Sequence, residues 1–329
     1  MGRKDSRRRK AEDLEASGWE ALGMPELGHS GNLRDAEEYF RQALAIDPEL
    51  GDAYNGLGTI LYFQQRLAEA EAMFRTALVK ARAELGPDKP RAFQWWGEIS
   101  TRPYMRARHN LGLVFWRQGK LNEAIREFQQ LLQRNPRDNQ GARYVIGGLY
   151  HLLGEVGKAI QCYSQADADR FGGSDPHTEF NWGLAEFQTK RYDDSVRHYR
   201  CAFFLNPYLP QVVLYRNVIP MDIWHGTNLA EPNYALDYWE NYSQLWIRRP
   251  QAVTFLRFVY EDDAVQTEMQ EVQEIRRKLG TEKSIRARSP LVDEWQRLIA
   301  HDRIESTNTG IASRVIVKFH APKGPAKRG

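Results

Sequence analysis

The 329-residue sequence lacks the features that mark several large classes of protein. It has only two cysteines, Cys162 and Cys201, which favours buried reduced thiols in a reducing compartment over a disulfide framework. No apolar segment of the kind found in secretory signals follows the basic N-terminus. No apolar run approaches the ~18 residues that a membrane-spanning helix needs. Together these absences predict a cytoplasmic protein without a membrane span.

Motifs for metal, phosphate or covalent chemistry are also missing. The eight histidines form no His-x3-His pair, and the cysteines form no Cys-x2-Cys pair, so no metal site is predicted. There is no phosphate-binding Gly-x4-Gly-Lys-Ser/Thr loop and no Gly-x-Ser-x-Gly nucleophile elbow. We therefore predict no catalytic residues and no cofactor. An unknown activity in the C-terminal third is the enzymatic alternative.

Charge of one sign is scarce as well, since 46 basic and 43 acidic residues leave a net charge of +3. A charge balance as even as this does not by itself indicate nucleic-acid binding. The basic excess is confined to the two ends, between Arg3 and Lys10 and at Lys323, Lys327 and Arg328. Charged ends of this kind are usually disordered, so residues 1–12 are predicted to be a disordered basic tail.

What the sequence does contain is a repeat, seen most clearly between Gly51 and Ala77. Apolar and small residues stand at the spacing of a helical stripe, first over one segment and then over a second. The first stripe comprises Tyr54, Leu57, Gly58 and Leu61, and the second comprises Ala70, Phe74 and Ala77. Gly58 and Ala70 are small, which lets two paired helices approach closely. Neither helix can bury its stripe alone, so the unit needs neighbours.

The same pattern occurs in five units. Its copies include Ala36, Phe40 and Ala43; then Leu111, Gly112, Phe115, Ala124 and Phe128; then Ile146, Gly147, Tyr150, Ala159 and Tyr163; and finally Trp182, Gly183, Ser195, Tyr199 and Ala202. Over residues 31–207 this pattern resembles the tetratricopeptide repeat family, whose unit is about 34 residues long. The segments at Arg102–Arg108 and Asn135–Arg143 resemble a group of uncharacterised bacterial tetratricopeptide proteins. The resemblance implies an interaction role and brings no catalytic residues with it.

The predicted fold is all-α, a right-handed α-solenoid of helix pairs with a helical C-terminal cap. The solenoid is expected over residues 13–247, with five to six repeats and an insertion at 86–103, and the cap over 248–310. In the first repeat the pattern is damaged and interrupted at Met24-Pro25, as in a degraded half-repeat. Residues 311–329 are predicted as a short strand, at Ser313–Phe319, and a basic tail. Phe93, Trp95 and Trp96 of the insertion either pack over a neighbouring helix or cover the binding groove.

Beyond the repeats, further helices are expected at Pro210–Ile219, Pro232–Ile247, Ala252–Tyr260, Ala264–Leu279 and Leu291–Ile304.

In the family that the sequence resembles, the first helix of each repeat lines a concave groove. The groove residues that this implies are Asn55, Tyr62, Arg106, His109, Asn110, Trp116, Arg117, Tyr144, His151, Phe180 and Asn181. Aromatic side chains supply anchoring area, while arginine and asparagine bind peptide backbone or carboxylate groups. The alternative is that Tyr144, Phe180 and Phe187 only fill a tight superhelix. No lysine stands where a carboxylate clamp would require one.

The sequence thus predicts a non-catalytic scaffold or adaptor that binds a protein or peptide partner in its groove. Two alternatives remain open. One is nucleic-acid association through the basic tails and the groove aromatics, which is the less favoured reading. The other is a structural subunit that binds its partner through the convex face.

Overall fold

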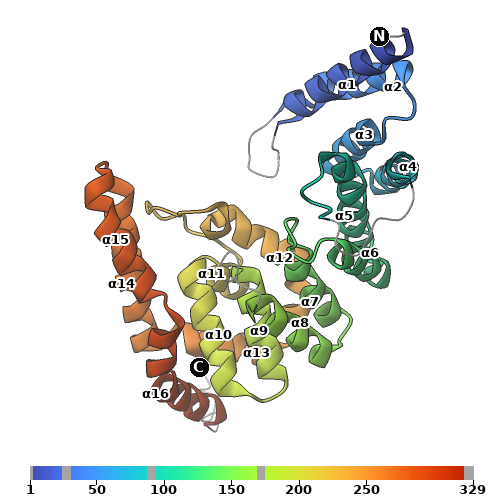
Figure 1. Ribbon diagram of the computed structural model, residues 1–329. Helices are drawn as coiled ribbons and strands as arrows, with labels where there is room; N and C mark the ends of the chain where they lie inside the picture. The colour runs from blue at the N-terminus through green and yellow to red at the C-terminus, as the bar shows by residue number, and fades with distance from the viewer. Residues whose placement is uncertain (1–2, 24–30, 87–93, 169–174, 322–329) are drawn as a thin grey trace. The chain divides into compact units, whose positions relative to one another are not determined.

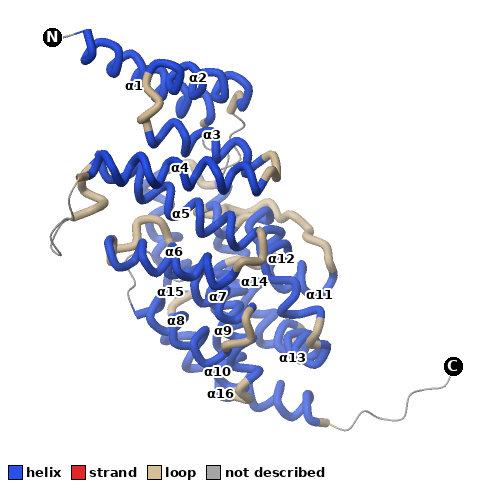
Figure 2. Tube along the Cα trace, turned by 90° about the vertical axis from the view of Figure 1, so that its right-hand side faces the viewer, coloured by secondary structure: helices blue, strands red, loops and turns tan. Residues whose placement is uncertain are grey.

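The computed structural model describes residues 3–23, 31–86, 94–168 and 175–321. Every regular element in these ranges is helical, and none of them is a strand (Figure 2). The prediction of an all-α fold is therefore confirmed. The chain divides into two compact units, residues 1–149 and 150–329. Among the described helices, none has the length and apolar character needed to cross a membrane.

The first unit is a series of paired helices. The pairs are α1 (Arg3–Leu22) with α2 (Leu33–Ile46), α3 (Gly51–Phe63) with α4 (Leu67–Leu85), and α5 (Arg102–Arg117) with α6 (Leu121–Arg134); α7 (Ala142–Leu152) follows. A glycine faces an aromatic ring inside each pair. A Cβ atom added to Gly58 would lie 2.6 Å from the Phe74 ring, and one added to Gly112 would lie 2.6 Å from the Phe128 ring. This close approach is what the repeat pattern predicts.

The N-terminal prediction of a disordered tail over residues 1–12 is wrong for the part that the structure describes. Helix α1 begins at Arg3, and Arg8 is bonded to Glu12 and Glu84. Ala11 is fully buried, so this helix packs through its apolar stripe.

The first repeat is accordingly a full helix pair and not a degraded half. A Cβ atom at Gly18 would lie 2.6 Å from the Phe40 ring, which repeats the contact of Gly58 with Phe74. The stretch of sequence from Gly18 to Ala36 is longer than the matching stretch from Gly58 to Ala70, so the connection between the two helices is longer in the first repeat. The predicted interruption at Met24-Pro25 lies outside the described residues.

The insertion at 86–103 is described from residue 94 onward. Trp95 is buried and its ring lies 5.5 Å from that of Tyr104, while the Thr101 hydroxyl donates a hydrogen bond to the Trp95 carbonyl. A short 3-10 turn, Ile99–Thr101, leads into α5. For Trp95, packing over a neighbouring helix is the correct interpretation. Residues 87–92 and Phe93 lie outside the described part.

The second unit continues the pairs and adds a helical C-terminal part (Figure 1). Its helices are α8 (Val156–Ala168), α9 (Pro176–Gln188), α10 (Tyr192–Leu205), α11 (Leu209–Tyr215), α12 (Pro232–Ile247), α13 (Pro250–Tyr260), α14 (Asp263–Thr281), α15 (Ile285–Leu298) and α16 (His301–His320). The pair α9 and α10 repeats the glycine contact, with a Cβ at Gly183 2.6 Å from the Tyr199 ring. Helix α11 is shorter than predicted because Arg216 takes a left-handed conformation, with φ of 57°.

Two predictions at the C-terminal end are wrong. Residues 313–319 belong to α16 and form no strand. Ile304, Ile311 and Val315 are buried on one side of that helix, because intervals of seven and four residues bring side chains to the same helical face. The helix expected over 291–304 is divided between α15 and α16, with a break at Ile299 and Ala300. The predicted basic tail at 322–329 lies outside the described residues.

A buried ion pair joins three helices of the second unit. Arg200 of α10 is fully buried and bonds Glu268 of α14 at 2.8 Å. The same guanidinium donates to the carbonyl of Ile304 at 2.9 Å and to the side chain of Asn308 at 3.2 Å. Both charges are therefore compensated inside the core, as buried charges require.

Candidate functional site

Side chains from α1, α3 and α5 lie together in the first unit and form what we call the first-helix face. It comprises Glu15, Trp19, Asp52, Asn55, Tyr62, Arg106 and Arg117, and the predicted residues His109, Asn110 and Trp116 belong to the same helix α5. Its centre is an ion pair between Asp52 of α3 and Arg106 of α5. The Asn55 amide donates to the Asp52 carboxylate and to the Pro103 carbonyl, both at 2.8 Å. The structure thus brings the predicted residues Asn55 and Arg106 to the same carboxylate, although Asn55 itself is fully buried and not exposed as predicted.

Helix α1 adds two residues to this face that the sequence analysis missed. The Arg106 guanidinium lies over the Trp19 ring, 4.4 Å from its centre, a distance typical of cation–π contacts. Burial, and secondarily the Asp52 charge, raise the pKa of Glu15 to about 8. This carboxyl is therefore mostly protonated at neutral pH. Because the connection after Gly18 is longer than in the other repeats, both side chains fall outside the repeat register.

Two buried polar atoms of this face have no hydrogen-bond partner in the described part of the protein. They are Nε1 of Trp19 and Oδ1 of Asn55. The first can only donate a hydrogen bond and the second can only accept one. Because buried polar groups are nearly always paired, each such exception calls for an explanation.

The remaining predicted residues of the first unit are partly buried. Arg117 donates to the Tyr62 hydroxyl at 3.3 Å, so α3 and α5 meet here again. The His109 ring packs edge-on against Phe128, and burial lowers its pKa. Asn110, Trp116 and Tyr144 are partly buried as well. The face therefore combines aromatic, amide and guanidinium groups that keep some contact with solvent.

In the second unit the corresponding prediction has to be corrected. Phe180 and Asn181 are buried, and both lie beneath α12 of the same unit. Tyr238 of α12 donates to the Asn181 side chain at 2.9 Å, and the Phe180 ring packs against Trp246 at 5.3 Å. The alternative that Phe180 fills the interior is the correct one. It does so because a later helix of the chain packs against this side of α9.

Contacts along α12 show that it is an integral part of the second unit. Tyr234 stacks on His177 with 3.7 Å between ring centres, and its hydroxyl donates to Asp175 at 2.5 Å. His177 donates in turn to the Tyr234 carbonyl at 2.7 Å.

His151 also differs from its prediction, because it is fully buried. Its two ring nitrogens bond Gln188 at 2.7 Å and Tyr163 at 3.3 Å. Burial, and then the charge of Arg249, lower its pKa to about 3. It lines a cavity of about 290 Å³ near the C-terminal end of α12. Both of its ring nitrogens already have hydrogen-bond partners within the chain.

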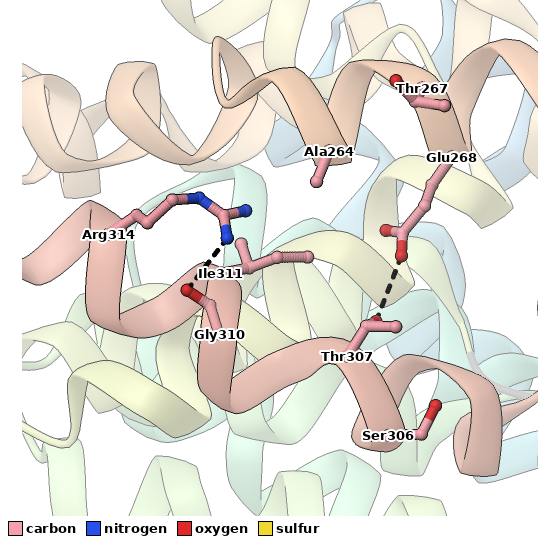
Figure 3. Close-up of a pocket in the computed structure, with 8 residues that line it drawn as sticks. All are labelled: Ala264, Thr267, Glu268, Ser306, Thr307, Gly310, Ile311 and Arg314. Carbon is pink, nitrogen blue, oxygen red and sulfur yellow. Dashed lines mark hydrogen bonds between the residues drawn. The ribbon is translucent and has the colours of Figure 1, made fainter.

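A second depression, of about 590 Å³, lies between α14 and α16 (Figure 3). Its charged groups are Glu268, which pairs with Arg200, and Arg314, which pairs with Asp262 at 2.8 Å. Because both are compensated within the chain, the depression offers no free charge to a ligand. Among the described residues no group of three or more potential metal ligands is placed to hold a metal ion.

Two family models, both described as tetratricopeptide repeat, match residues 29–85 and 109–176. The chain contains tetratricopeptide repeats over these ranges. The matched ranges cover the pairs in which Gly58 and Gly112 face Phe74 and Phe128. Tetratricopeptide repeats are in general interaction modules without catalytic activity. Their presence supports a general role of this chain in binding protein partners.

No curated protein matches the sequence. Solved structures with similar folds include YrrB, a tetratricopeptide protein with an unusual peptide-binding site (19% identity, 53% of this chain and 78% of that one, TM-score 0.40). They also include pilF of Pseudomonas aeruginosa (16%, 82% and 98%, TM-score 0.48). A third is the C-terminal part of a repeat-containing protein from Cytophaga hutchinsonii (15%, 93% and 98%, TM-score 0.43). The assignment of these repeats rests on the family models and on the register of the helix pairs.

Proposed function

We propose that the first-helix face of the first unit binds an extended peptide segment of a protein partner. The observation that carries this proposal is that Trp19 Nε1 and Asn55 Oδ1 are buried without partners among the described residues. The partly exposed Arg106 lies over the Trp19 ring and pairs with Asp52, the carboxylate that Asn55 also bonds. A peptide group has one N–H and one C=O. It can therefore supply both the donor that Asn55 lacks and the acceptor that Trp19 lacks.

Arg106 acts as the movable element in this proposal. Its side chain is 35% exposed and lies above Trp19 while it pairs with Asp52. A guanidinium has five N–H donors in a fork that suits carboxylates. Its pairing with Asp52 uses Nη1, so the remaining donors can bind a carboxylate or a carbonyl of the partner. A small shift of this side chain uncovers the Trp19 indole.

Aromatic residues of the first unit provide anchoring area in this proposal. Tyr62, Trp116 and Tyr144 are partly buried, and binding energy in interfaces concentrates on aromatic residues. The second unit is not included, because α12 covers the matching side of α9. The peptide site is thus proposed for the first unit alone.

The test begins with a random peptide library, selected on the full-length chain. Affinities of the selected peptides are then measured for wild type, Trp19→Phe, Tyr62→Ala and the control Arg41→Ala. Trp19→Phe keeps an aromatic ring and removes the indole N–H. Arg41 has a side chain 65% exposed on α2, away from the first-helix face.

We expect binding to weaken by about 1–2 kcal/mol in Trp19→Phe and by about 2 kcal/mol in Tyr62→Ala, with no change in the control. Equal affinities for all four proteins would refute the proposal and favour a convex-face partner. Selective binding of an oligonucleotide, with a steep dependence on salt, would favour nucleic acid instead.

A further inference from the structure

A second arginine of the second unit is buried, but its environment differs from that of Arg200. Arg276 of α14 is 2% exposed. Its Nη2 donates to the Leu205 carbonyl at 3.2 Å, while Nε and Nη1 have no partner among the described residues. An arginine is almost never buried without full pairing.

No carboxylate in the described part of the chain compensates this guanidinium. Burial lowers the pKa of Arg276 to about 10, and the only group that acts in the opposite direction is the Tyr208 phenol. In contrast, Arg200 has Glu268, two side-chain partners and a backbone carbonyl around it. The second unit therefore provides a carboxylate for Arg200, whose role is structural. Among the described residues it provides none for Arg276.

A second unpartnered donor lies beside Arg276. The guanidinium is 5.6 Å from the centre of the Trp295 ring, and Nε1 of Trp295 is buried without a hydrogen-bond partner among the residues that the structure describes. Indole N–H groups only donate, as guanidinium groups do. Two neighbouring side chains thus present three donor atoms without an acceptor.

Further positive charge and aromatic surface adjoin this pair. The Trp295 ring is 5.4 Å from the ring of Trp224, and Arg288 lies over Trp224 at 5.4 Å. Arg288 donates to the carbonyls of Leu279 and Glu282, so its partners in the described ranges are backbone groups and not carboxylates. Burial, and to a lesser degree the charge of Arg276, lower the pKa of His225.

The surrounding elements leave a route to solvent. Helix α15 contains no buried residue, and Trp295 on it is only partly buried. Figure 1 shows α15 lying beside α14, to which it is packed. A small ligand can therefore reach the guanidinium by a limited movement of α15, without opening the core that contains Arg200.

We propose that Arg276 and Trp295 form a binding site for an oxyanion, either a phosphate group or a carboxylate, between α14 and α15. Oxyanions accept several hydrogen bonds at once, and arginine binds them in a bidentate manner. The ligand would accept hydrogen bonds from the indole and from one edge of the guanidinium, either Nε or Nη1 together with Nη2. It would also supply the charge that no described carboxylate provides. This site is independent of the peptide site proposed for the first unit.

The test uses the full-length chain with sodium phosphate and sodium acetate as probes. Sodium chloride keeps the ionic strength constant, and binding is followed by tryptophan fluorescence and by melting temperature. The variants are Arg276→Gln and Trp295→Phe, and the matched control is Arg277→Gln. Arg277 is the next residue on the same helix, has a side chain 55% exposed and pairs with Glu274.

We expect saturable binding of at least one anion to wild type, weakened about tenfold or more in Arg276→Gln, since charge-assisted hydrogen bonds are the strong ones. Trp295→Phe should weaken it about threefold to tenfold, and Arg277→Gln less than twofold. Preference for phosphate over acetate identifies a phosphate group as the ligand, and the reverse preference identifies a carboxylate.

Absence of binding by both anions to wild type would overturn the proposal, as would unchanged affinity in Trp295→Phe and Arg276→Gln. Should Arg276→Gln fail to fold, Trp295→Phe decides, because it retains an aromatic ring to pack against Trp224.

Discussion

Glu15 provides the sharpest prediction for the first unit. Its pKa changes from an ordinary 4.5 to about 8 on folding. The folded protein therefore holds this proton more tightly than the unfolded chain does. The stability linked to it is complete below pH 4.5, decreases as the pH rises toward 8, and stays constant above that.

The magnitude follows from the difference between these two pKa values. The difference is about 3.5, and at about 1.36 kcal/mol per unit of pKa it corresponds to about 4.8 kcal/mol. Glu15 keeps partial contact with solvent and shares its site with Asp52 and Arg106. Screening therefore reduces the expected effect to about 2–3 kcal/mol.

Glu15→Gln is the change that isolates this effect. Glutamine is neutral at every pH and keeps an oxygen that can accept the hydrogen bond from the Ala53 backbone. We expect urea unfolding to give similar stabilities for the variant and wild type at pH 5. At pH 9 the variant should be more stable by about 2–3 kcal/mol.

Glu20→Gln, at an exposed position of the same helix, controls for a general effect of removing a carboxylate. It should follow wild type at both pH values. The reasoning would be refuted if Glu15→Gln and wild type differed by the same amount at pH 5 and pH 9.

Three further tests concern packing and buried bonding. Gly112→Ala places a Cβ 2.6 Å from the Phe128 ring and should lower the free energy of thermal unfolding by about 1–3 kcal/mol. The control Gly157→Ala in α8, where an added Cβ has nothing within 4 Å, should raise it by about 0.5–1 kcal/mol. Equal effects of the two changes would mean that the helix pairing is wrong. Tyr238→Phe leaves two buried groups unpaired and should cost about 1–3 kcal/mol, so an unchanged melting temperature would show that α12 is not an integral element. Glu268→Gln removes the counter-charge of a buried arginine and should cost about 3–5 kcal/mol; a melting temperature equal to that of wild type would contradict the buried pair.

The repeat register could be predicted because it depends on short-range spacing. Gly58 and Phe74 stand at the same separation in the sequence as Gly112 and Phe128, so one pattern finds both pairs. Gly18 faces Phe40 in the same way, but a longer stretch of sequence separates them. That longer connection explains why the first helix of repeat one, expected from residue 13, is out of register with the other repeats, and why Trp19 and Glu15 are not among the predicted groove residues.

Two other errors have a common physical cause. Residues 313–319 are rich in valine and isoleucine, which favours a strand locally. Yet Val315 shares a buried helical stripe with Ile304 and Ile311, and tertiary packing of that stripe outweighs local preference. Likewise the pattern of the repeat that contains Phe180 predicts an exposed groove position for this residue. The helix that covers it, α12, begins only at Pro232, beyond the end of that repeat.

The oxyanion site could not be found from the sequence at all. Arg276 and Trp295 stand on two different helices, and their neighbour Trp224 lies in a distant loop. No local pattern of residues connects them. Only the fold shows that the guanidinium is buried and that no described carboxylate pairs with it.

The most direct test of the central claim is photo-cross-linking at two tyrosine positions. A benzoylphenylalanine replaces Tyr62 on the first-helix face in one protein and Tyr39, exposed on α2, in the other. Each is irradiated with a peptide selected on the wild-type chain. The account predicts a cross-link from position 62 and none from position 39. Cross-linking from position 39 without any from position 62 would contradict it.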